Sequence, residues 1–125
     1  MRYFLMAILS LGVVLNSPYL IWAHPPESVE LQYDKDQGIL HVKIQHVVRS
    51  NSNRHYIKKL EIYKNQEPPT EQFNHSQKSP SEDQIDVPIK LQGGDTVRVI
   101  AFCVKGGTKE ATLAIPAEDT DEKKK

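Results

Sequence analysis

Short segments in which apolar and polar residues alternate make up most of this sequence, and turn residues separate them. In residues 28–33, 40–46 and 96–104 the apolar side chains recur at every second position, which is the period of a β-strand. Asp34–Gly38 and Gly106–Gly107 supply glycines of the kind that tight turns between strands prefer. No segment beyond residue 23 keeps the 3.6-residue period of an amphipathic helix. The chain is therefore expected to fold by packing strands against strands.

This pattern predicts an all-β fold, an immunoglobulin-like antiparallel β-sandwich of about seven strands. Alternation is imperfect within residues 56–64, which predicts a β-bulge there, and Pro88 favours an edge strand. The Cys…Trp…Cys pattern of antibody domains is absent, so the expected likeness is one of architecture. The expected strands cover residues 28–33, 40–46, 56–64, 71–75, 84–91, 96–104 and 111–115. The expected core contains Leu40, Val42, Ile44, Val97, Val99, Ala101, Leu113 and Ile115.

The N-terminus carries a segment typical of secretory signal peptides. Arg2 precedes a largely apolar run over residues 3–15, the polar and proline residues 16–18 break it, and Ala23 offers a small residue at a cleavage position. An uncleaved membrane anchor is the alternative, but the run is shorter than the ~20 residues that span a bilayer. Cleavage after Ala23 would place the protein outside the cytoplasm, secreted or periplasmic, and free of the membrane.

Domain organisation follows from this cleavage. Residues 1–23 are expected to be removed, residues 24–116 to form one sandwich domain, and residues 117–125 to be a charged, disordered tail. A remainder of about 100 residues suits one independently folding domain. Sixteen basic and sixteen acidic residues balance each other, which gives no reason to expect nucleic acid as a partner. The single cysteine excludes an internal disulfide.

Two histidines and the cysteine are expected at one end of the sandwich. His46 ends one strand on its inward face, His55 opens the next, and Cys103 lies inward near the end of a later strand. Imidazole and thiolate together favour a transition metal over magnesium or calcium. The alternative is structural, because a strand-end histidine is often only hydrogen-bonded and an inward cysteine often acts as a small apolar residue.

Two stretches resemble the iron-site domain of superoxide reductases and desulfoferrodoxins. His46–Val48 followed by Arg54–Tyr63 resembles the family's His-Pro-Met and Glu-His-Tyr-Ile strand. Gly94–Val97 with Ala101–Cys103 resembles its Gly-Asp-x-Val … Ala-Tyr-Cys-Asn-x-His-Gly. The likeness extends over residues 31–115, and it implies an immunoglobulin-like sandwich, in agreement with the strand pattern.

The resemblance also implies a mononuclear, non-haem iron held by four equatorial histidines and one axial cysteine. His46 and His55 match two of those histidines, and Cys103 matches the axial thiolate. The loop between His46 and His55 is longer than the family's spacer. Gly106 stands where the family has a further histidine, and the family's superoxide-attracting lysine has no clear counterpart.

His24 is the candidate that could complete the set of ligands. After cleavage it would carry a free α-amine, with a pKa of about 7.7–8.0, which can chelate one ion together with the imidazole of the same residue. Such a chelate suits copper as well as iron. The alternative is that His24 is only the frayed start of the first strand. A four-histidine site would also need His41, which faces outward, or His75, which lies in a polar loop.

Three functions follow from these observations. The first is a superoxide-reductase-like oxidoreductase, with superoxide as substrate and an unidentified electron donor. The second is a non-catalytic copper or iron carrier that uses His24, His46, His55 and Cys103. The third is a structural sandwich that has lost the metal. The missing histidine at Gly106 favours the second and third over the first.

Overall fold

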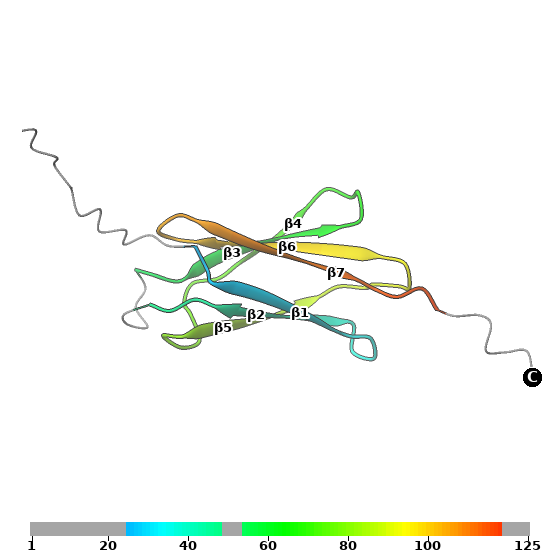
Figure 1. The fold of residues 1–125 in the computed structure, drawn as a ribbon, viewed down its shortest axis with the longest axis horizontal. Coiled ribbons are helices and arrows are strands. Elements are labelled where there is room, and N and C mark those ends of the chain that lie inside the picture. Colours follow the sequence, from blue (N-terminus) through cyan, green and yellow to red (C-terminus); the bar gives the residue numbers. More distant parts are fainter. Residues whose placement is uncertain (1–24, 49–53, 119–125) are drawn as a thin grey trace, which may run out of the picture.

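The structure is a computed structural model that describes residues 25–48 and 54–118. The described residues form seven β-strands and no helix (Figure 1). The N-terminal segment predicted to be cleaved, His24 and most of the predicted tail lie outside the described residues. The strands are β1 (Ser28–Asp34), β2 (Ile39–Gln45), β3 (Ile57–Lys64), β4 (Thr70–Phe73), β5 (Glu82–Pro88), β6 (Thr96–Cys103) and β7 (Thr108–Ala114).

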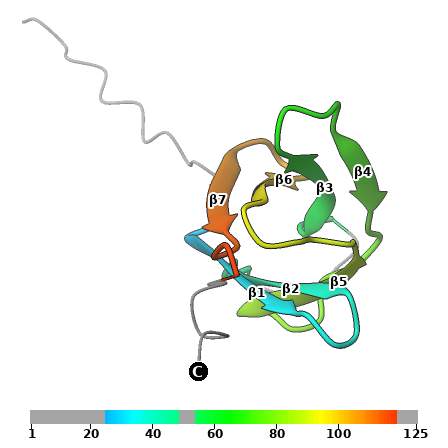
Figure 2. The ribbon, with the colours of Figure 1, turned by 90° about the vertical axis from the view of Figure 1, so that its right-hand side faces the viewer.

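The strands pair into two antiparallel sheets. One sheet has the order β1-β2-β5 and the other the order β4-β3-β6-β7. Figure 2 shows the smaller sheet beneath the larger one, with β1 and β7 adjacent on one side. The chain changes sheet between β2 and β3, between β4 and β5, and between β5 and β6, as immunoglobulin-like sandwiches do. The predicted all-β sandwich is confirmed.

The core lies between the two sheets. It is formed mainly by residues at alternate positions of the strands, whose side chains face inward. Six of the eight predicted core residues are fully buried. Leu113, in the edge strand β7, and Ile115, just after it, pack against the core but stay partly exposed. Val29, Leu31 and Tyr33 of β1 also pack against the core, as their shared phase predicts. The fully buried predicted residues are Leu40, Val42, Ile44, Val97, Val99 and Ala101.

The start of β7 differs from the predicted one because polar residues pair there through their backbone. β7 begins at Thr108, three residues before its first predicted position, because the exposed residues there pair with β6 through their backbone. The predicted bulge in β3 is present, as a register shift between Ile57 and Lys59. Pro88 ends β5, which is an edge strand as predicted.

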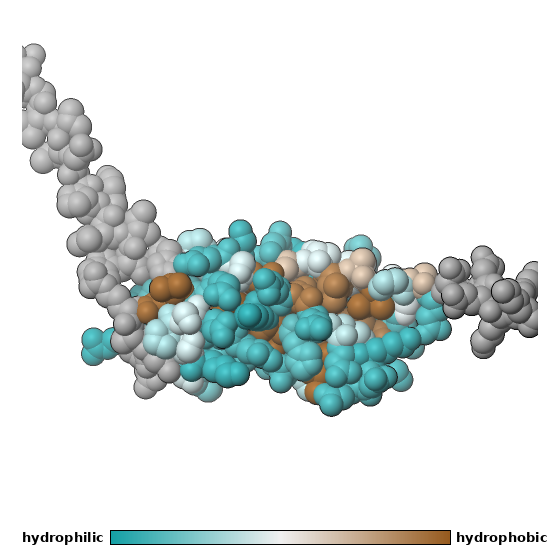
Figure 3. Space-filling model, turned by 60° about the horizontal axis from the view of Figure 1, so that its bottom comes forward, coloured by the Kyte–Doolittle hydropathy of each residue, from teal (hydrophilic) through white to brown (hydrophobic). Residues whose placement is uncertain are grey.

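The face of the molecule drawn in Figure 3 is mainly polar. In Figure 3, hydrophilic residues cover most of one face, and hydrophobic residues form a band between them. Within residues 25–48 and 54–118 no helix is long and apolar enough to cross a membrane.

Candidate metal centre

One end of the sandwich, on the left in Figure 1, collects the three residues expected there. His46 directly follows β2, His55 lies two residues before β3, and Cys103 ends β6. One ligand atom from each residue lies within 4.8 Å of those of the other two. The sequence predicted this convergence from the positions of the residues at strand ends.

His46 is fully buried and held at three points. Its backbone N–H donates to the carbonyl oxygen of Ser81 (3.1 Å), and its own carbonyl oxygen accepts from Nε2 of Gln77 (2.6 Å). Its ring Nδ1 lies 2.7 Å from Oε1 of Gln77. Backbone and ring are therefore fixed by the same side chain.

Gln77 is a residue that the sequence pattern did not single out. It is 2% exposed, and Nε2 also donates to the carbonyl oxygen of Ser79 (2.7 Å). Residues 65–81 look polar and interrupted by proline, without the alternation that would mark Gln77 as buried. Only the packing of this loop over His46 gives Gln77 its position.

His55 is half-buried and packs its ring edge-on against His46. The ring centroids are 4.8 Å apart, and the ring planes meet at 84°. The Val104 N–H donates to the carbonyl oxygen of Tyr56 (3.0 Å), so the neighbours of Cys103 and His55 are hydrogen-bonded to each other. This bond connects the start of β3 with the turn that carries Cys103.

Cys103 is a free cysteine, 1% exposed, in a tight turn between β6 and β7. Its N–H donates to the carbonyl oxygen of Gly107 (3.1 Å), and its carbonyl oxygen accepts from Gly106 N–H (3.0 Å). Burial raises the pKa of the thiol above 9.0, while the Lys105 backbone N–H and the charges of Lys105 and Lys58 lower it in part. The thiol is thus neutral near pH 7, and ligation would release its proton.

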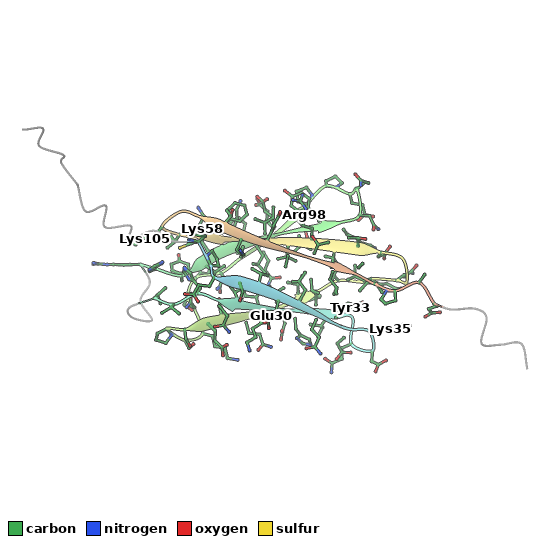
Figure 4. The ribbon with its side chains drawn as sticks, in the orientation of Figure 1. Glu30, Tyr33, Lys35, Lys58, Arg98 and Lys105 are labelled. Atoms are coloured by element: carbon green, nitrogen blue, oxygen red, sulfur yellow. The ribbon has the colours of Figure 1, made fainter. Side chains whose placement is uncertain are left out.

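Figure 4 labels Lys58 and Lys105 at this end of the sandwich and Lys35 at the other. The positive charges that act on the thiol therefore gather beside the candidate site.

The other two histidines of the described residues, His41 and His75, lie apart from this group. His41 faces outward, where its Nδ1 lies 2.7 Å from Oδ1 of Asp86, and His75 is exposed.

His24, the predicted fourth ligand, lies outside the described residues, but its neighbour Pro25 does not. A Cβ atom built on Gly107 would stand 2.9 Å from both N and Cα of Pro25. The chain following His24 therefore contacts the turn that carries Cys103.

The three donors fit a transition-metal ion. Two imidazoles and a thiolate suit iron, copper or zinc. With metal–ligand bonds of about 2.0–2.3 Å, donors on one ion lie about 3–4 Å apart, so atoms within 4.8 Å need only small side-chain movements. Nε2 of both histidines is shielded from solvent.

Comparisons with known proteins give structural matches alone. No family model matches the sequence, and no curated protein matches it. The chain is similar to a superoxide reductase (neelaredoxin) from Ignicoccus hospitalis, with a TM-score of 0.45 and 18% identity over 76% of this chain and 81% of the other. It is also similar to a superoxide reductase from Nanoarchaeum equitans, with a TM-score of 0.44 and 18% identity over 74% and 94% of the two chains.

Proposed function

We propose that this protein is an exported, mononuclear metal-binding protein of the superoxide-reductase type, with iron bound by His46, His55 and Cys103 and completed by His24. The observation that carries the proposal is the approach of three donor atoms to within 4.8 Å at one end of the sandwich. A purely structural role would need no such meeting of imidazole and thiol groups from three different segments.

When bound, iron at this site would supply one-electron redox chemistry towards superoxide. Cys103 would contribute a thiolate, and the buried positions of His46 and Cys103 would keep water from two of the ligands. Lys58 and Lys105 add positive charge near the thiolate, which favours the approach of an anion. Superoxide and an electron donor are accordingly the proposed partners.

His24 is proposed as a ligand through both its imidazole and the α-amine exposed by cleavage after Ala23. Pro25, the next residue in the chain, contacts Gly107 in the turn that carries Cys103, and this contact supports the proposal. The side chain of Pro26 is fully buried and secures the segment to the domain. Export and the mature form starting at His24 are parts of the same proposal.

A copper or iron carrier is the second candidate, and Gly106 favours it. This glycine forms part of the turn and has φ +105°. Because it has no side chain, the site lacks the imidazole that the family has at this position. Two histidines and one cysteine also resemble the ligands of copper electron-transfer sites. Reaction with superoxide separates the two candidates, because only the reductase should consume it.

Metal quantification and optical spectroscopy of protein that starts at His24 test the proposal. Samples loaded separately with Fe(II) and Cu(II) should each bind about one ion, and after oxidation of the iron sample they should show a thiolate charge-transfer band in the visible range. Cys103→Ser should remove this band, and His46→Ala should weaken binding. His41→Ala is the matched control, because His41 lies on the outer face beside Asp86.

An unchanged metal content and spectrum in Cys103→Ser would contradict the proposed site. The absence of any bound metal in the wild-type protein would favour a structural sandwich instead. Metal binding without consumption of superoxide would favour the carrier.

A further inference from the structure

The amide group of Gln77 can have only one orientation in its present position. Its nitrogen lies 2.6 Å from the carbonyl oxygen of His46 and 2.7 Å from that of Ser79. Carbonyl oxygens only accept hydrogen bonds, so the donating –NH₂ must face both of them. The amide oxygen is thereby left to face the imidazole of His46.

This orientation determines where the neutral imidazole carries its proton. Oε1 of Gln77 only accepts, and it lies 2.7 Å from Nδ1 of His46. Nδ1 must therefore carry the hydrogen, and in a neutral ring Nε2 then holds the lone pair. We infer that Gln77 is a positioning residue that fixes the tautomer of His46 and makes Nε2 the metal-binding nitrogen, an inference that rests on the proposed metal-binding function.

The loop that carries Gln77 is itself held firmly against the sheet. The buried carboxylate of Asp83 accepts from the Lys78 N–H (3.1 Å) and from Nδ2 of Asn74 (2.8 Å), the residues on either side of Gln77 along the loop. The Val48 N–H donates to the carbonyl oxygen of Pro80 (2.7 Å), which ties the same loop to the chain after His46. Gln77 therefore cannot turn away without breaking several buried hydrogen bonds.

A histidine ligand whose second nitrogen is hydrogen-bonded has a fixed ring orientation and a more basic donor nitrogen. Loss of such a partner typically weakens metal affinity about 10–100-fold. In this chain the partner at Nδ1 is a neutral amide, so the ring is oriented by a group that carries no charge.

Nitrogen NMR of the full chain with labelled histidines tests the inference directly. The sample contains no metal, and the pH is one at which the rings are neutral. The wild-type protein should show His46 with the proton on Nδ1. The Gln77→Leu variant keeps the bulk of the side chain and removes the amide. In it, a substantial fraction of the His46 rings should shift to the Nε2–H form that free imidazole side chains prefer. Gln84→Leu is the matched control, because Gln84 is exposed on β5, and it should retain the wild-type tautomer.

Titration with Co(II) gives the second readout. Gln77→Leu should bind Co(II) about 10–100-fold more weakly than Gln84→Leu. A proton on Nε2 in the wild-type protein would overturn the inference even if Gln77→Leu failed to fold, and so would an unchanged tautomer in a folded Gln77→Leu. A wild-type protein with the Nδ1–H tautomer that binds no Co(II) would refute the proposed function and leave the tautomer assignment in place.

Discussion

Replacement of Gly107 by alanine tests whether the segment following His24 is seated on the turn that carries Cys103. The new Cβ atom would lie 2.9 Å from backbone atoms of Pro25, a distance that forces one of the two segments to move. Gly106→Ala is the control, because a Cβ atom built there has nothing within 4 Å. Both glycines belong to the same turn and have positive φ, +88° at Gly107 and +105° at Gly106.

The expected magnitudes follow from strain and burial. A side chain in such a left-handed conformation costs about 1–3 kcal/mol, and both variants share this cost. Gly107→Ala must also displace Pro25, and with it the fully buried ring of Pro26. Three methylene groups at about 0.8 kcal/mol each set an upper limit of about 2.4 kcal/mol for this further loss. Gly107→Ala should thus be less stable than Gly106→Ala by up to about 2 kcal/mol.

Thermal unfolding of the metal-free variants, followed by circular dichroism, measures the difference. In a domain of this size each 1 kcal/mol shifts Tm by about 4–8 °C, so the expected gap is easily resolved. Metal titration of the same variants then addresses His24. If His24 is a ligand, Gly107→Ala should bind metal at least about tenfold more weakly than Gly106→Ala, in the range that misplaced ligands cause.

Two results would refute the reasoning. Equal Tm values for the two variants would mean that Pro25 is not seated on Gly107. A lower Tm for Gly107→Ala with unchanged metal affinity would remove His24 from the site while leaving the contact itself intact.

Three further predictions concern the core, the pH dependence and the N-terminus. Leu40→Ala should lower the free energy of unfolding by about 2–5 kcal/mol, because Leu40 is fully buried, whereas Lys43→Ala on the opposite face of β2 should cost less than about 0.5 kcal/mol; urea unfolding compares them, and equal costs would mean a wrong strand phase. Burial raises the pKa of Asp83 above 3.8, so its contribution to stability is present below pH 3.8 and is lost as the pH rises through the folded-state pKa; Asp83→Asn should flatten this part of the pH profile of urea unfolding, and an unaltered profile would contradict it. Intact mass of the exported protein should correspond to a chain that begins at His24, and retention of residues 1–23 would exclude the amine ligand.

Much of the fold could be predicted from the alternation of residues alone. β2 and β6 are the central examples, since Leu40, Val42 and Val99 occupy every second position and are all fully buried. A strand exposes one face and buries the other, so buried and exposed residues alternate along it and the pattern can be recognised within a single segment. The same local signal assigned His46 and Cys103 to the inward side, and both are buried.

The limits of β7 could not be predicted in this way. Its first three residues are polar and exposed, so they carry no burial signal, and their strand conformation comes from hydrogen bonds to β6. Backbone hydrogen bonds are available to every residue except proline, and a sequence pattern does not record where they form.

The sequence by itself determined the strands, their inward faces and the presence of imidazole and thiol groups at strand ends. Only the tertiary structure decided what surrounds those groups. Gln77 lies 31 positions from His46 in the chain, and Pro25 is far from Gly107, yet each pair is in contact. Such contacts depend on how loops from different strands pack at one end of the sandwich, which no periodicity within a single segment encodes.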